Sequence, residues 1–176
     1  MIPPVNINDI PSLQADFKID DNYTSEIKTI LKQPLSIENE EELLKLIFNL
    51  IDLTSLEGAD TSTKIEALCD KVLSLESIKN VPNVAAICVY PTFAKLVRQK
   101  LNKTSINTAC VAGAFPSGQS SLSVKLKEVE WAIKEGATEI DMVISRGKLI
   151  EGNYQTVFDE IVSIKQCCGL AHLKVI

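Results

Sequence analysis

An aspartate interrupts one of the most apolar stretches of this sequence. Asp141 lies within residues 139–144, where alternation places Ile140 and Met142 on one face of a strand and Asp141 with Glu139 on the other. Burying a carboxylate is costly unless the group is paired or hydrogen-bonded. We therefore expect Asp141 to be either a functional residue or a tightly paired one.

A lysine occupies a second apolar strand. Lys174 lies within residues 173–176, on the same face as His172 and Ile176, and we expect it beside Asp141 on the neighbouring strand. Burial favours the neutral form of an amine, so it should lower the pKa of Lys174 toward neutrality. From the residues alone, Lys174 is a candidate nucleophile, and an ion pair with Asp141 is the alternative.

Two further apolar runs carry polar or reactive side chains on one face. Asp52 and Thr54 alternate with apolar residues in 51–54, and Cys88 lies within 84–89. Strands of a barrel turn one face to the helices and the other to the interior, with functional groups near their carboxyl ends. We expect Cys88 to be a small interior side chain in preference to a reactive thiol.

Helical patterns separate the strands. Strands are predicted to start near residues 51, 84, 108, 139 and 172, with apolar residues at helical spacing between them. A βα unit takes about 30 residues, so this rhythm predicts parallel strands joined by right-handed crossovers. Four helices are expected. The first begins at Thr61 or Ser62, and the second begins at Ser121 or Ser123 and ends at Gly136. The third ends at Gly169, and a shorter one spans 93–101.

This repeat fits two α/β folds, a doubly wound sheet and a TIM (β/α)8 barrel. No G-x-G-x-x-G follows the first strand, which weakens the nucleotide-binding alternative, and the two-faced strands favour the barrel. A barrel has eight strands and typically about 250 residues, whereas this sequence has 176 residues. We therefore expect residues 51–176 to form about five βα units, the N-terminal portion of a truncated barrel.

Residues 1–50 are organised differently, and we expect them to form a helical N-terminal extension. A short helix is predicted over 25–31, and a firmer one starts where Asn39 and Glu42 have the spacing of a capping box. Its apolar face, which we expect to cover the bottom of the barrel, consists of Leu43, Leu44, Ile47 and Leu50.

The composition is that of a globular enzyme domain, and it argues against several classes of partner. A net charge of −5 with no basic stripe argues against nucleic acid, and no apolar run reaches the length of a membrane span. Five cysteines, an odd number within helix and strand patterns, predict reduced thiols in the cytoplasm. With His172 as the one histidine, we expect no metal site.

Four ordered motifs resemble one known family, the deoxyribose-phosphate aldolases. The resemblance runs from about residue 51 to the end, and the longer, eukaryotic forms of the family have a similar N-terminal extension. The matching segments are 51–61, 85–91, 111–118 and 136–144, followed by a fifth-strand match over 173–176.

The resemblance implies a class I aldolase with a TIM barrel and no metal or cofactor, acting in deoxynucleoside catabolism in the cytoplasm. Such an enzyme cleaves the small sugar phosphate 2-deoxy-D-ribose 5-phosphate to glyceraldehyde 3-phosphate and acetaldehyde through a lysine Schiff base. By the same resemblance, Asp141 belongs to the proton relay, Lys174 is a pocket lysine paired with it, and Phe115 and Cys88 line the pocket. Asp52 and Thr54 either contact the sugar hydroxyls or cap the first βα loop.

The sequence lacks several parts of this family. The family's Schiff-base lysine lies in a sixth-strand motif that these residues do not contain, and its second catalytic lysine and phosphate-binding loops are also missing. We therefore expect residues 1–176 by themselves to be inactive. A different Schiff-base sugar-phosphate aldolase and a non-catalytic truncated product are the alternatives. Trp131 lies off the apolar stripe of its helix, so it is a candidate for a contact between subunits of a homo-oligomer.

Overall fold

A computed structural model gives the fold. The described residues are 21–33, 39–75, 77–78 and 80–176. The chain divides into two compact units, 1–43 and 44–176. The first unit contains α2 (Asp21–Lys32), which includes the short helix expected over 25–31. The division falls inside α3 (Glu40–Asn49), so the expectation that 1–50 is a separate extension stays a prediction.

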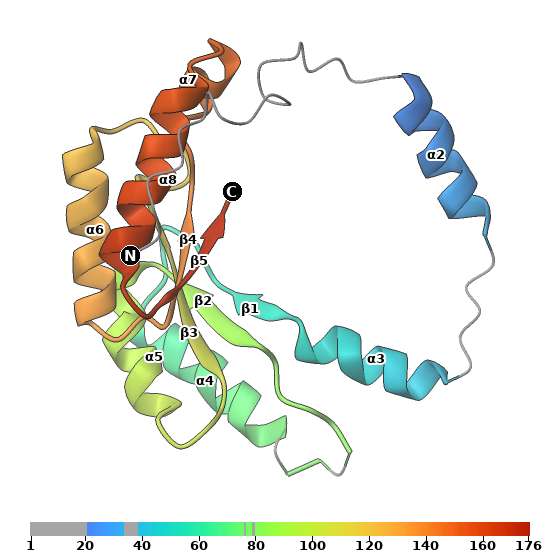
Figure 1. The fold of residues 1–176 in the computed structure, drawn as a ribbon. Helices are drawn as coiled ribbons and strands as arrows, with labels where there is room; N and C mark the ends of the chain where they lie inside the picture. Colours follow the sequence, from blue (N-terminus) through green and yellow to red (C-terminus); the bar gives the residue numbers. More distant parts are fainter. Residues whose placement is uncertain (1–20, 34–38, 76, 79) are drawn as a thin grey trace. The chain divides into compact units, whose positions relative to one another are not determined.

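The second unit is built on one parallel sheet (Figure 1). Its strands are β1 (Asp52–Thr54), β2 (Ala86–Val89), β3 (Asn107–Ala112), β4 (Glu139–Met142) and β5 (His172–Val175). They begin at or within two residues of the predicted starts and pair in sequential order, β1-β2-β3-β4-β5. A doubly wound sheet reverses its strand order at a switch point. The sequential order therefore agrees with the βα units of a TIM-type barrel.

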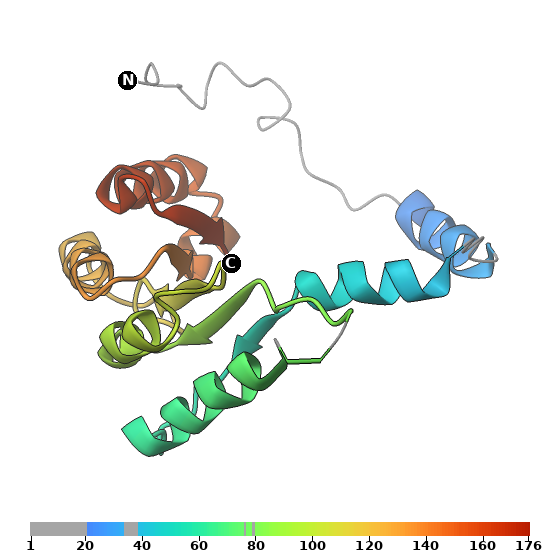
Figure 2. The same cartoon turned by 90° about the horizontal axis from the view of Figure 1, so that it is seen from below.

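Helices follow the strands, and four of them lie against one side of the sheet. The helices are α4 (Ser62–Leu75), the short 3-10 helix η2 (Pro91–Phe93), α5 (Ala94–Lys100), α6 (Leu122–Lys134), α7 (Arg146–Ile150) and α8 (Tyr154–Cys168). Figure 2 shows α4, α5, α6 and α8 on the same side of the strands. The helix expected over 93–101 starts as a 3-10 turn at Pro91, and α7 was not expected from the periodicity.

The two faces of the sheet have different environments, as the alternation predicted. On the helix side, Ile87, Val89, Ile140 and Met142 are fully buried in the main core with side chains from α4, α6 and α8. Each aliphatic side chain buried in this way stabilises the fold by about 1.5–3 kcal/mol. The opposite face carries a smaller cluster made of Ala86, Cys88, Ala109, Val111, Leu56, Tyr90 and Phe115.

Two helix starts have the side-chain caps that the sequence suggested. The Thr61 hydroxyl accepts a hydrogen bond from the Lys64 amide at 3.3 Å, at the start of α4. The Asn39 side chain accepts one from the Glu42 amide at 3.2 Å, at the start of α3. These bonds satisfy amide groups that the first turn of a helix leaves unpaired.

The apolar face of α3 is exposed. None of its residues is buried, and Leu44, Ile47 and the following Leu50 expose 58%, 50% and 69% of their surface. Phe48 is the partly buried side chain that packs against the main core. The exposure of α3 therefore does not support its expected role as a cover for the bottom of the barrel. Among the described residues, no helix has the length and hydropathy needed to span a membrane.

Candidate active site

An ammonium group lies on the face of the sheet that is turned away from the helices, where it meets three carboxylates. The Nζ atom of Lys174 is 3.0 Å from Asp141 Oδ1 and 2.9 Å from Glu139 Oε2, and it also donates a hydrogen bond to Asp52 Oδ2. We call Asp52, Glu139, Asp141 and Lys174 the carboxylate cluster. Lys174 is about one-third exposed, whereas Asp141 exposes 8% of its surface.

The contact between Lys174 and Asp52 requires a strongly curved sheet. Asp52 is on β1 and Lys174 on β5, at the two edges of the five strands. In a flat sheet, those edges would be about 19 Å apart, farther than the two side chains can bridge. The face opposite the helices must therefore be concave, as in the wall of a barrel.

Burial controls the ionisation of Asp141. Desolvation raises the pKa of this carboxyl group, and its contacts with Lys174 oppose the shift without cancelling it. The Cys88 thiol donates a weak hydrogen bond to Asp141 Oδ2 across 3.6 Å. Asp141 is consequently an acid whose pKa lies above its usual range, inside a partly dry concave face.

The predicted lowering of the Lys174 pKa is wrong. Burial acts in that direction, but contacts with Asp52, Glu139 and Asp141 outweigh it and raise the pKa of the amine above its usual range. The alternation of one strand could not show that three carboxylates meet this group. A lysine held as an ammonium ion lacks the free electron pair that a nucleophile needs, so the geometry favours the ion-pair alternative.

Cys88 and Phe115 share the apolar cluster of the concave face, and Cys88 contacts Asp141. Cys88 is 3% exposed, and burial, reinforced by the charge of Asp141, raises the pKa of its thiol to about 12. Such a thiol is almost entirely protonated at neutral pH and is a poor nucleophile. Phe115 is partly buried and packs against the small apolar cluster that contains Cys88.

The first βα loop is closed by a residue other than Asp52 or Thr54. The Thr54 hydroxyl donates to the main-chain oxygen of Asp52 at 2.9 Å, and the Asp52 carboxylate faces Lys174. Asp60 instead accepts hydrogen bonds from the Ser55 hydroxyl and the Glu57 amide. The geometry therefore does not support the loop-capping alternative for Asp52, and contact with the sugar hydroxyls stays a prediction.

Sequence reasoning assigned no role to two members of this polar network. Glu139 was placed on the same face as Asp141 by alternation, and it proves to be a third carboxylate around Lys174. The Asn107 amide donates to Glu139 Oε1 at 2.6 Å. Asn107 opens β3, and its only signal in the sequence is a polar residue at the start of an apolar strand.

The loop after β3 packs directly against the end of β4. Gly113 and Gly118 have φ values of +79° and +70°, and a side chain at Gly118 would collide with the main-chain oxygen of Ile144. The Glu128 carboxylate of α6 accepts a hydrogen bond from the Ala114 amide at 2.8 Å. These contacts fix the loop that carries Phe115.

A buried ion pair secures the other side of β4. Lys125 on α6 is fully buried, and its Nζ atom lies 2.5 Å from Glu160 Oε1 on α8 and 3.0 Å from the Ser145 hydroxyl. The Ser145 amide donates to the second oxygen of Glu160 at 2.8 Å. Because Ser145 follows β4 by three residues, the pair ties the end of the strand that carries Asp141 to two helices.

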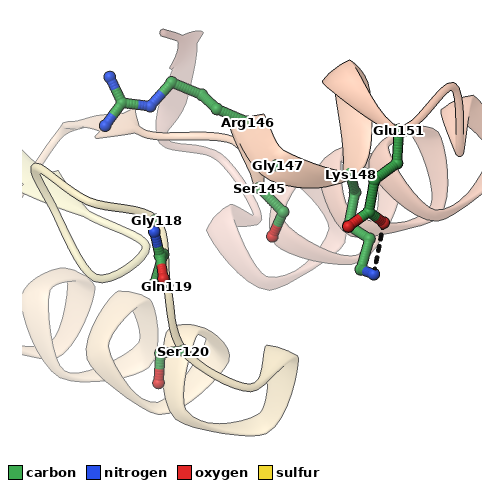
Figure 3. Close-up of a pocket in the computed structure, with 8 residues that line it drawn as sticks. All are labelled: Gly118, Gln119, Ser120, Ser145, Arg146, Gly147, Lys148 and Glu151. Atoms are coloured by element: carbon green, nitrogen blue, oxygen red, sulfur yellow. Dashed lines mark hydrogen bonds and ion pairs between the residues drawn. The ribbon is translucent and has the colours of Figure 1, made fainter.

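A pocket of about 310 Å³ lies beside the ends of β3 and β4 (Figure 3). Its lining residues are Gly118, Gln119, Ser120, Ser145, Arg146, Gly147, Lys148 and Glu151. Figure 3 shows Arg146 turned away from residues 118–120, and Lys148 is paired with Glu151 at 2.8 Å. None of the candidate site residues lines this pocket, so we place the candidate active site at the carboxylate cluster.

Comparison with known proteins places this geometry in a family. Residues 46–176 match the DeoC/LacD family of aldolases. The human protein named deoxyribose-phosphate aldolase is 39% identical over 145 residues, which cover 76% of this chain and 45% of the human one. The chain spans about half the length of the curated relatives it matches.

Solved structures agree with the fold. A crystal structure from Coccidioides immitis aligns with a TM-score of 0.67 and 30% identity, over 74% of this chain and 49% of that one. A tetrameric deoxyribose phosphate aldolase from Aeropyrum pernix aligns with a TM-score of 0.59 and 24% identity, over 74% and 52% of the two chains. These matches confirm the resemblance seen in the sequence motifs and the TIM-barrel fold class, and the chain belongs to the DeoC/LacD aldolase family.

Proposed function

We propose that this protein cleaves 2-deoxy-D-ribose 5-phosphate to glyceraldehyde 3-phosphate and acetaldehyde through a Schiff base. The similarity to the human deoxyribose-phosphate aldolase supports the choice of substrate. The observation that carries the proposal within this chain is the position of Asp141, a buried acid of raised pKa beside the Lys174 ammonium on a concave face.

Asp141 is the proton donor and acceptor in this proposal. Formation of the imine requires loss of water from a carbinolamine, and cleavage leaves an enamine that must take up a proton. An acid or base with a pKa shifted toward neutrality transfers protons efficiently at both steps. The raised pKa of Asp141 and its contact with Lys174 support this role.

The remaining candidate residues bind and orient the substrate. Lys174 stays protonated and supplies positive charge next to Asp141. Asp52 and Thr54 are proposed to face the sugar hydroxyls, and Cys88 with Phe115 forms an apolar wall, supported by their shared cluster. No metal or cofactor enters the proposed reaction.

The Schiff-base amine is assigned to a sixth strand, following the resemblance, and not to Lys174. The strands β1–β5 contain no match to the sixth-strand motif of the family. The proposal accordingly concerns the protein in which such a strand is present. It includes a cytoplasmic location, supported by five free thiols, and a homo-oligomer, supported by the exposure of Trp131.

Trapping of the imine tests this function. The protein is incubated with acetaldehyde and borohydride, which reduces the imine to a stable secondary amine, and the modified lysine is located by peptide mass spectrometry. We expect an adduct on one lysine other than Lys174, together with release of glyceraldehyde 3-phosphate from the sugar phosphate. An adduct on Lys174 would reassign the nucleophile, and absence of both adduct and cleavage would refute the function.

A further inference from the structure

Glu139 holds the Lys174 ammonium from the amino-terminal side of Asp141. Its Oε2 atom lies 2.9 Å from Lys174 Nζ, and its Oε1 atom accepts the 2.6 Å hydrogen bond from Asn107. Both carboxylate oxygens of Glu139 are therefore engaged, one by a cation and one by a neutral amide. The side chain is 14% exposed, so solvent screens these contacts only weakly.

The carboxylate cluster contains more negative than positive charge. Asp52 comes from β1, Glu139 and Asp141 come from β4, and Lys174 on β5 is the cation that meets all three carboxylates. The thiol of Cys88 faces Asp141 from β2. From β3, Asn107 contributes an amide that cannot titrate. One ammonium cannot fully neutralise three carboxylates, so they compete for it.

We propose that Glu139, held in place by Asn107, is a positioning residue that prevents Lys174 from pairing exclusively with Asp141 and so keeps Asp141 able to accept and release a proton. Asn107 is suited to this task because it fixes Glu139 without adding a second cation. The catalytic consequence rests on the proposed aldolase function, whereas the competition for Lys174 is independent of it.

The ionisation of the two partners agrees with this arrangement. Burial lowers the pKa of Lys174, and the contacts with Asp52, Glu139 and Asp141 more than offset it. Burial raises the pKa of Asp141, and Lys174 only partly opposes the shift. Glu139 thus acts on Asp141 through Lys174, by taking part of the charge that would otherwise lower the pKa of Asp141.

Removing the charge of Glu139 while keeping its shape tests this inference. In Glu139→Gln, the Lys174 ammonium has one carboxylate fewer and interacts more strongly with Asp141. We expect the titration midpoint of the Asp141 carboxyl carbon, followed by NMR in the full-length unliganded protein, to move to lower pH. The Lys174 midpoint should move the same way. Glu130→Gln, which breaks an exposed ion pair with Lys127 on α6, is the matched control and should change neither midpoint.

A second variant separates positioning from simple loss of charge. Asn107→Leu removes the donor and leaves Glu139 charged but unanchored, and we expect a smaller shift of the Asp141 midpoint in the same direction. This variant also serves as the test if Glu139→Gln fails to fold. Unchanged Asp141 midpoints in the folded variants would overturn the inference.

Activity provides a separate readout. If the protein is an aldolase, the pKa that Asp141 contributes to the kcat/KM profile should shift to lower pH in Glu139→Gln, as in the titration. A shifted titration in a protein without cleavage activity would support the role of Glu139 in the cluster and refute the proposed function alone. Cleavage activity with an unshifted titration would support the proposed function and refute the role of Glu139 in the cluster.

Discussion

Asp141 and Lys174 form an ion pair on the concave face. Their charged atoms are 3.0 Å apart, and the same ammonium also meets Asp52 and Glu139. Asp141 therefore shares its cation with two other carboxylates. The contact with Lys174 lowers the pKa of Asp141 by less than burial raises it.

Asp141→Asn should abolish most of the proposed activity. The amide keeps the shape of the side chain but cannot transfer a proton, and general acid–base catalysis contributes roughly 100- to 10,000-fold to a rate. We expect a fall in kcat of that size in a steady-state cleavage assay of the whole protein. Asp159→Asn, an exposed aspartate on α8, is the control and should retain full activity. Near-normal turnover in Asp141→Asn would remove Asp141 from the proton relay.

The same substitution should change how stability depends on pH. Because the pKa of Asp141 is raised in the folded protein, the native state binds more protons than the unfolded state between the usual pKa of 3.8 and the raised one. The wild-type protein therefore loses stability relative to Asp141→Asn as the pH rises through this window. Urea unfolding midpoints of the two proteins, measured across this range, check the sign. A gain for the wild type over the same window would show that the pKa of Asp141 is lowered.

Lys174→Met should destabilise the protein at neutral pH. It leaves Asp52, Glu139 and Asp141 facing one another without a cation. Removing one partner of a buried pair costs about 3–5 kcal/mol, and we expect the lower end, about 3 kcal/mol, because Lys174 is about one-third exposed. The cost should shrink as acid protonates the carboxylates, which urea melts at two pH values would show. Lys148→Met, which breaks an exposed pair, should cost less than about 1 kcal/mol.

The five thiols should differ in their reactivity. Cys69, Cys88, Cys110 and Cys168 are 0–3% exposed, and burial raises the pKa of each thiol to about 11 or 12. Cys167 is partly exposed, so we expect iodoacetamide at pH 8 to label it first in the folded protein. Peptide mass spectrometry reads out the order, with labelling in urea as the control for all five. Early labelling of Cys88 would contradict its place on the buried face.

Lys125 and Glu160 should stabilise the fold only when both are present. Lys125→Met strands a buried carboxylate and Glu160→Gln strands a buried ammonium, so each should lower the free energy of unfolding by about 3–5 kcal/mol. The double variant Lys125→Met/Glu160→Gln should cost markedly less than the sum of the two single variants, because neither charge remains. Denaturant melts of the four proteins measure the coupling. Additive losses would show that the two charges act independently.

Much of the fold follows from local pattern. Alternation and helical spacing predicted β1–β5 within two residues of their starts and assigned Ile140 and Met142 to the helix side. Hydrophobic periodicity can be identified in one segment at a time, because a side chain's direction depends only on the backbone geometry of its own strand or helix. The 3-10 start at Pro91 and the short α7 were missed, since neither has a full helical period to read.

The sequence by itself determined that an acid and an amine lie in apolar strands of a parallel βα repeat, because period-two alternation is a property of each strand alone. Only the tertiary structure decided their chemical state. The curvature that brings Asp52 from β1 to Lys174 on β5, and the placement of Glu139 against the same ammonium, depend on all five strands together. Charge interactions depend on distances in space, which is why the pKa of Lys174 rises where burial alone would have lowered it.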